Sequence, residues 1–277
     1  FPPRETKRVP AMFDWTDDVA GSVSYLSVRP GGYTADTTPE GETVRTYLDV
    51  GENPPAGVVI TYRLEAAPEQ PLRLTIHNAA GEEMRAFTSR TADDPLPAKE
   101  LRAPARAGWN RFVWDMRHAP APKVEGADPP SKDTFAGPLV APGEYRVTLA
   151  LGERELTQSF RIVMPKDVTT RQAELEAQQA VSLRIHEEVT RTVRAINQMR
   201  DLRAQLDGWA QRTREREGGT EIAAAADALR DAVLEIEKTL LVPDLRSSWE
   251  AYNYGTKLLG KLTSLAADVA LGDYPPT

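Results

Sequence analysis

The stretch Val58-Val59-Ile60-Thr61-Tyr62-Arg63-Leu64 carries an apolar side chain at every second position. Because successive side chains of a β-strand point to opposite faces, Val58, Ile60, Tyr62 and Leu64 share one face of a strand. The alternation returns in the segments 72–77, 111–116, 144–149 and 156–162. Short strands with one apolar face each bury those faces when two sheets pair face to face. The sequence therefore predicts a β-sandwich over residues 44–164.

After Pro165 the spacing of apolar residues changes to about 3.5, the value of packed helices. A first helix has the apolar row Val181, Ile185, Val189, Val193, Ile196, Met199, Leu202, Leu206 and Trp209. A second, after Gly218-Gly219, has the row Ile222, Ala225, Leu229, Val233, Ile236 and Leu240. A third, after Pro243, has the row Leu245, Trp249, Tyr252, Leu259, Leu262, Ala266 and Val269. Three rows of one period predict an antiparallel three-helix bundle with long helices over residues 167–272.

Residues 1–43 show neither period. Gly31-Gly32 and the segment 39–42 are turn signals, so we expect an irregular linker or strap. Its scattered aromatics include Trp15 and Tyr33, which are candidate binding residues. The chain starts at Phe1-Pro2-Pro3-Arg4, without an initiator methionine or a signal peptide. We therefore expect it to be part of a longer or processed chain.

Composition argues against several classes of function. The 277-residue chain has a formal net charge of −7, which disfavours nucleic acid as a partner because phosphate binding needs a basic face. No apolar run reaches the roughly 20 residues of a transmembrane helix, so no transmembrane segment is expected. The chain has no cysteine, which rules out disulfides and the commonest structural zinc sites.

The pattern of polar residues in the sequence indicates no catalytic residue, no metal site and no cofactor. His77, His118 and His186 are the only histidines and lie far apart in sequence. His186 is followed by two glutamates, as in a zinc-protease helix, but Thr190 stands where the second histidine ligand belongs. A calcium loop needs a different spacing of carboxylates from that of Asp14, Asp17 and Asp18.

Two tryptophans are predicted to point to opposite faces of one strand. Trp114 lies on the apolar face and is a core residue. Trp109 lies on the other face, where it either stacks on a sugar or packs under the helical part; we favour packing, because exposed large aromatics are uncommon unless they bind something. A structural motif is also expected, because Asn before two prolines fixes an extended turn; it comprises Glu52, Asn53, Pro54, Pro55, Trp114 and Asp115.

Several segments together carry a resemblance to a known family. They are 51–55 with 58–64, Gly108-Trp109-Asn110-Arg111-Phe112-Val113-Trp114-Asp115-Met116-Arg117, 137–145, 200–206 and 252–254 with 261–262. This set resembles the C-terminal region of bacterial sortilin-like BNR β-propeller proteins, which are large exported proteins often labelled glycosyl hydrolase. The middle segment also resembles the Ig-like domain of flagellar hook-capping proteins. The resemblance covers most of residues 45–277 and does not include the propeller, so no activity of the propeller carries over.

The resemblance implies an Ig-like or fibronectin-like sandwich before the helical bundle, and a secreted, periplasmic or cell-surface location. It implies the parent β-propeller domain or another protein subunit as the partner. In relatives a further helix follows the stretch equivalent to 272–277. Without that helix the bundle leaves an apolar groove, which we expect a partner helix or another subunit to fill. A helix-mediated oligomer is therefore a further expectation.

These observations favour a non-catalytic accessory module, not an enzyme, that mediates protein–protein interaction or assembly of a larger exported β-propeller protein. One alternative is a carbohydrate-binding module that uses outward aromatics such as Trp109; a row of exposed rings would favour it. Another is a fragment of a glycoside hydrolase or a metal hydrolase. A glycosidase needs two carboxylates that converge at about 5–10 Å in one cleft.

Overall fold

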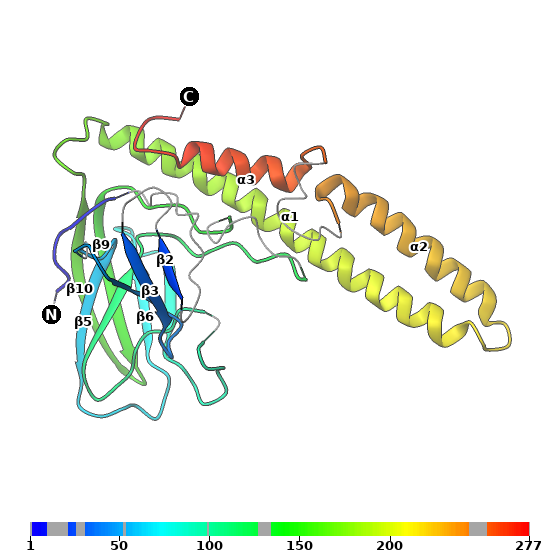
Figure 1. The fold of residues 1–277 in the computed structure, drawn as a ribbon, viewed down its shortest axis with the longest axis horizontal. Coiled ribbons are helices and arrows are strands. Elements are labelled where there is room, and N and C mark those ends of the chain that lie inside the picture. The colour runs from blue at the N-terminus through cyan, green and yellow to red at the C-terminus, as the bar shows by residue number, and fades with distance from the viewer. Residues whose placement is uncertain are drawn as a thin grey trace. The chain divides into compact units, whose positions relative to one another are not determined.

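The computed structural model describes residues 2–9, 22–25, 31–51, 54–98, 100–126, 134–243 and 254–276. Within them the chain forms β-sheets and then three helices, as the two spacings predict (Figure 1). Internal contacts divide the chain into two units. The first comprises Phe1–Ala119 with Leu139–Glu176, and the second comprises Pro120–Pro138 with Ala177–Thr277.

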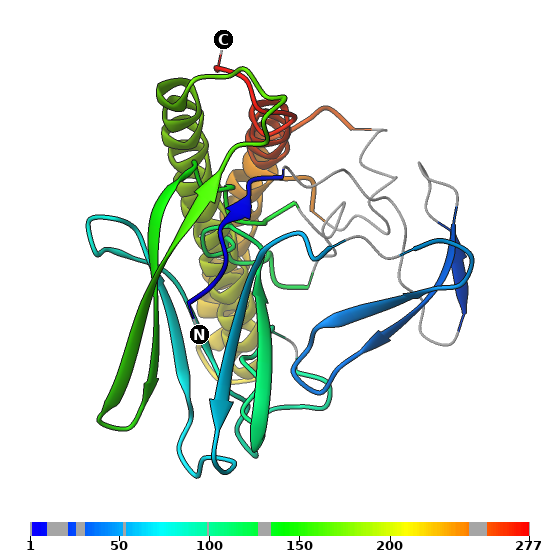
Figure 2. The same cartoon turned by 90° about the vertical axis from the view of Figure 1, so that its left-hand side faces the viewer.

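The described strands of the first unit form three sheets (Figure 2). Five strands pair in the order β1-β10-β9-β6-β7, three in the order β2-β3-β4, and two as β5-β8. Among the described strands, only β1 and β10 pair in parallel. The strands are β1 (Thr6–Lys7), β2 (Val23–Tyr25), β3 (Gly32–Thr37), β4 (Thr43–Tyr47), β5 (Val58–Leu64), β6 (Arg73–His77), β7 (Glu83–Thr88), β8 (Gly108–Trp114), β9 (Gly143–Leu151) and β10 (Arg154–Val163).

One apolar core joins the five-stranded and the two-stranded sheets. The register of β5 and β8 places Val58 opposite Trp114 and Ile60 opposite Phe112. The predicted alternation is confirmed for most of the apolar faces, whose buried residues are Val58, Ile60, Tyr62, Leu64, Leu72, Leu74, Ile76, Phe112, Trp114, Tyr145, Val147, Phe160 and Ile162. It is wrong for Leu156, which is exposed near the start of β10. Each such side chain, fully buried, stabilises the fold by about 1.5–3 kcal/mol.

The segment 1–43 is more regular than its sequence indicates, since it contains β1, β2 and β3. Strand β3 pairs with β4, and this register places Tyr33 opposite Tyr47. Tyr33 and Ala35 are buried while Asp36 is exposed, which is a short period-two pattern that the neighbouring glycines obscure. The expectation of an irregular strap is therefore wrong for these strands.

The helices α1 (Gln172–Thr213), α2 (Gly219–Leu240) and α3 (Leu258–Val269) follow the strands. Figure 1 shows α2 and α3 one after the other along α1, and the contacts agree. Leu206 and Ala210 of α1 pack with Ala223 and Ala226 of α2. The amide of Gln178, near the start of α1, donates to the carbonyl of Val269 at 2.9 Å. The return helices share one partner because α1 has 42 residues, whereas α2 has 22 and α3 has 12.

The Pro-rich residues 117–142 are predicted to form a long loop that crosses the sandwich, but residues 120–138 belong to the helical unit instead. Ala121, Val124 and Phe135 share a core cluster with residues of α1 and α3. The side-chain amide of Asn197 on α1 holds this segment with both its oxygen and its nitrogen. It accepts from the backbone N–H of Glu125 at 3.0 Å and donates to the carbonyl of Lys123 at 2.9 Å. The described apolar residues of the segment thus form part of the core of the helical unit.

Candidate functional site

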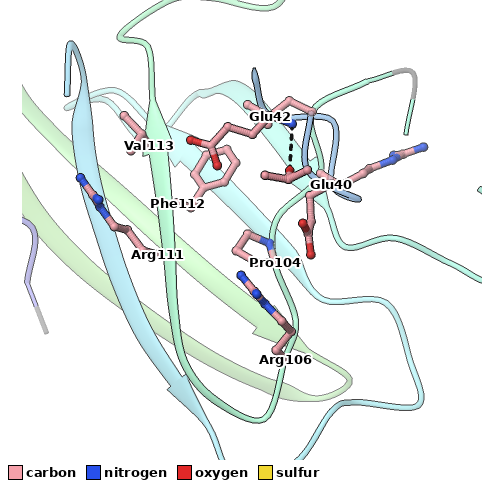
Figure 3. A pocket seen from close by; sticks show the side chains of 10 residues that line it. Glu40, Glu42, Pro104, Arg106, Arg111, Phe112 and Val113 are labelled. Atoms are coloured by element: carbon pink, nitrogen blue, oxygen red, sulfur yellow. Dashed lines mark hydrogen bonds between the residues drawn. The ribbon is translucent and has the colours of Figure 1, made fainter. Parts of the chain in front are cut away.

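A small polar cavity lies in the first unit, beside the turn that precedes β4 (Figure 3). Its volume is about 40 Å³, and Glu40, Glu42, Arg106 and Arg111 are among the residues that line it. Such a volume holds a few water molecules at most, since one water fills about 10–15 Å³ on this scale. Two glutamates and three arginines thus line a cavity that has no room for a sugar ring.

The described ranges contain no group of three or more acidic, histidine or cysteine side chains that would hold a metal ion. His77 lies at the end of β6 and His186 on α1, and both are partly buried. The residues Asp14, Asp17 and Asp18, weighed above as cation ligands, lie outside the described residues. None of the described helices is long and apolar enough to cross a bilayer.

The two tryptophans of β8 point to opposite faces, as predicted. Trp114 is fully buried, and its indole N–H donates to the carbonyl of Arg117 at 3.0 Å. Its ring meets Tyr145 and Phe160 edge-on, at centroid distances of 6.0 and 6.2 Å. Trp109 is 59% exposed, so the expectation that it is buried by packing is wrong. Its register partner is the exposed Arg63, and the apolar face of the strand is turned away from it.

The other two candidate binding residues are Tyr33 and Trp15. Tyr33 is fully buried, with the guanidinium carbon of Arg45 4.7 Å from its ring centroid. It packs within the small sheet, and the expectation of a binding aromatic does not hold at this position. Trp15 lies outside the described residues.

The predicted structural motif is described in part, because Glu52 and Asn53 lie outside the described residues. Pro54 and Pro55 are exposed, and the carbonyl of Pro55 accepts from the N–H of Gly57 at 2.9 Å. A Cβ on Gly57 would lie 2.3 Å from the carbonyl oxygen of Trp114, so this turn passes close to the end of β8. Asp115 accepts from Arg85 at 2.8 Å, and it fixes the turn after β8.

A larger groove lies between α1 and α3 in the helical unit. Its volume is about 560 Å³. The groove is lined by Val181, Arg184, Ile185, Glu187, Glu188, Leu262, Leu265, Val269 and Pro276. Its apolar walls come from both helices, and Leu265 is 48% exposed. The carboxylates of Glu187 and Glu188 each lie 3.5 Å from the guanidinium of Arg191, so the charged rim is partly neutralised. This arrangement suits apolar side chains of another molecule, with polar groups at the edge.

Only part of the row predicted for the second helix packs inward: Val233 is buried and Leu240 is partly buried, while the other members of the row are exposed. The buried residues of α2 are Gly219, Ala223, Ala226, Val233 and Glu237, and we call the last four the inner row. Ile222, Leu229 and Ile236 are instead 54, 50 and 58% exposed. The small alanines allow close approach of α1. The signal that sequence reasoning missed is Glu237, whose carboxylate is fully buried between Arg200 and Arg203 at 2.9 and 2.6 Å.

Comparison of the chain with models of protein families, with curated proteins and with solved structures found no match. The assignment of function therefore depends on the surfaces described above.

Proposed function

We propose that this chain is a non-catalytic accessory module of a larger exported β-propeller protein of the sortilin-like type. In this proposal the first unit is an Ig-like sandwich. The second is an antiparallel helical bundle in which α2 and α3 share one long partner helix. The bundle holds either the parent propeller or another subunit, and the protein acts outside the cytoplasm, in the periplasm or at the cell surface. The family and location rest on the residues that carry the resemblance.

The observation that carries the interaction function is the apolar groove between α1 and α3. Contiguous apolar surface that is rimmed by polar residues typically marks a protein–protein interface. Here the walls are Val181 and Ile185 on one side and Leu262, Leu265 and Val269 on the other. The helices do not close over these residues, since Leu265 remains 48% exposed. A partner that inserted apolar side chains would complete the packing of this layer.

Site-specific photo-crosslinking tests this function. A benzoylphenylalanine replaces Leu265 in the full-length exported protein, and mass spectrometry identifies the cross-linked peptides. Gln211 is the matched control, because it is also an exposed helical residue but lies away from the groove. We expect peptides of the propeller or of another subunit from position 265 and none from position 211. Absence of such peptides at position 265 would contradict the proposal.

A second candidate function, carbohydrate binding, is favoured by one observation. Trp109 exposes 59% of its surface on β8, as a sugar-stacking ring requires. Among the described residues of the first unit, however, no second aromatic side chain of comparable exposure lies with it to form a row. Titration with cellohexaose and chitohexaose, monitored by tryptophan fluorescence, decides this case. Binding that Trp109→Ala abolishes would support it, and an unchanged spectrum at millimolar sugar would exclude these two ligands.

A further inference from the structure

The hairpin of α1 and α2 carries a second set of apolar side chains that face solvent. We call it the outer row: Leu202, Trp209, Ile222, Leu229 and Ile236. Their exposed fractions are 39, 55, 54, 50 and 58% in that order. On each helix the members recur at intervals of seven, so they lie along one line of the helix surface. Isolated exposed leucines need no explanation, but five in line on two neighbouring helices do.

Ion pairs fix the register of the hairpin and show that both halves of the outer row lie on the same side. Arg203 of α1 pairs with Glu237 of α2, and Arg214 pairs with Asp227. In this antiparallel register Leu202 lies within about one helical turn of Ile236, and Trp209 lies within about one helical turn of Leu229. In an antiparallel pair of helices, the residue just before an inward-facing residue points to the same side of the pair on both helices. The residues of the outer row therefore share one side of the hairpin.

The opposite side of the hairpin is charged. Arg230 contacts Asp207 at 3.1 Å and Asp227 at 2.9 Å, while Arg214 contacts Asp227 at 2.9 Å. One side of the hairpin is therefore a network of ion pairs that is suited to water. The other side consists of five large apolar side chains, and this contrast points to a partner on that side.

The directions of the two rows on α2 indicate how many helices complete the structure. The exposed residues Ile222, Leu229 and Ile236 form one side of α2 together with Ala225 and Ala232. With about 100° per residue, the direction of this set lies about 80–110° from the direction of the inner row. In a square four-helix bundle the two neighbours of a helix lie at about 90°, whereas in a triangular bundle they lie at about 60°. The outer row thus fits two additional helices rather than one.

We propose that the occupant is a second copy of this chain, so that two α1/α2 hairpins pack outer row against outer row in a four-helix bundle. This inference rests on the proposed interaction function, because it names one partner of the helical unit. A two-fold axis along the hairpin places α1 of one copy against α2 of the other. The same axis brings the edge of α1 that bears Arg212 beside the edge of α2 that bears Glu221, so opposite charges flank the apolar contact.

The available area agrees with a dimer. The 22 residues of α2 are about 33 Å long, and two helices side by side are about 20 Å wide, which gives a flat area of about 650 Å². A stable interface buries about 800 Å² per partner. Because side chains make the surface uneven, the area that is buried exceeds the flat area and approaches this value. A single docked helix would cover only part of this face.

Sedimentation velocity of the intact chain tests the proposal, with Leu229→Glu as the disrupting variant. Ala224→Glu is the matched control, since it adds the same charge at an exposed position of α2 outside the outer row. We expect wild type and the control to approach twice the 30.6 kDa chain mass as concentration rises. Leu229→Glu should weaken self-association at least about tenfold, because a charge then replaces an apolar anchor at the centre of the interface. Circular dichroism verifies that both variants keep their helices.

Two outcomes would overturn the inference. One is a wild-type chain that remains a monomer to about 100 μM, well above the range of specific dimers. The other is a dimer that Leu229→Glu leaves as strong as the control. If a photo-crosslinker at position 229 instead captured propeller peptides, the second copy would be the wrong occupant. Failure here leaves the proposed function intact, because that function is read from position 265 in the groove of α1 and α3.

Discussion

The buried carboxylate of Glu237 gives the sharpest test of how the helical unit is held together. It accepts from the Nε of Arg200 at 2.9 Å and from the Nη1 of Arg203 at 2.6 Å, and no part of it is exposed. The two arginine side chains are 23 and 25% exposed, so they keep only partial access to water. Replacing Glu237 by alanine leaves two half-buried cations without their common anion.

The expected loss for Glu237→Ala is about 3 kcal/mol. Two hydrogen bonds to charged groups contribute about 1.5–3 kcal/mol each, and partial hydration of the arginines offsets some of that sum. Breaking a buried pair by removing one partner costs about 3–5 kcal/mol in other proteins. Glu237→Gln should fall between wild type and alanine, because its amide oxygen still accepts one hydrogen bond.

Urea unfolding, followed by the far-UV helical signal, measures this loss. Glu235→Ala is the matched control: its carboxylate pairs with Lys238 at 2.6 Å, but the side chain is 71% exposed. The control should change stability by less than about 0.5 kcal/mol, as exposed pairs do. The reasoning would be refuted if Glu237→Ala lost no more stability than Glu235→Ala.

Three other predictions concern the packing of each unit. Gly57→Ala should destabilise the first unit by about 1–3 kcal/mol, because its Cβ would lie 2.3 Å from the carbonyl oxygen of Trp114; an unchanged urea midpoint of tryptophan fluorescence would contradict this. Burial raises the pKa of Tyr145 from 10.0 to about 12. The unfolded state therefore loses this proton first, and stability that is complete below pH 10 should fall by roughly 2–3 kcal/mol as pH rises to about 12. A Tyr145→Phe variant that showed the same decline would refute this assignment. Asn197→Ala removes both hydrogen bonds that hold the segment 120–138, so limited proteolysis should cleave that segment faster than in wild type; equal cleavage rates would show that its apolar contacts suffice.

The strands of the first unit were predictable because burial on one face imposes a period of two. This period predicts Val58, Ile60 and Trp114 in the core, where the structure has them. The same logic failed for Tyr33, because its strand is only six residues long and begins beside two glycines, so the turn signal outweighs the alternation. Trp109 was assigned to the correct face, but sequence does not say whether that face is covered.

The helices show where a period alone is insufficient. On α1 the predicted row is buried from Ile185 to Ile196, but it is wrong for Leu202 and Trp209, which are exposed. On α2 two rows of similar period overlap at Val233, and the sequence predicts the more apolar one, with Ile222, Leu229 and Ile236, as the packing row. The structure uses the other, because alanines at 223 and 226 allow close approach and Glu237 meets two arginines. Which row of a helix packs inward depends on the helix that it pairs with, and the sequence of one helix alone does not contain this information.

An apolar groove is expected from the family resemblance, and the structure has one between α1 and α3. The predicted third row began at Leu245, but the residues 244–253 lie outside the described residues, and α3 begins at Leu258. The 12 residues of α3 cover only one strip of α1, which leaves Val181 and Ile185 lining the groove. The length of a return helix follows from its ends, which are the least predictable part of a helix.

Hydrogen–deuterium exchange on α3 tests the central claim, that the helical unit holds another protein through its groove, most directly. The backbone amides of residues 258–269 are compared in the isolated chain and in the larger exported protein that we propose as its parent. The account predicts that exchange of these amides slows at least about tenfold in that larger protein, because a bound partner must leave before α3 opens. Equal exchange rates in the two samples would contradict the account.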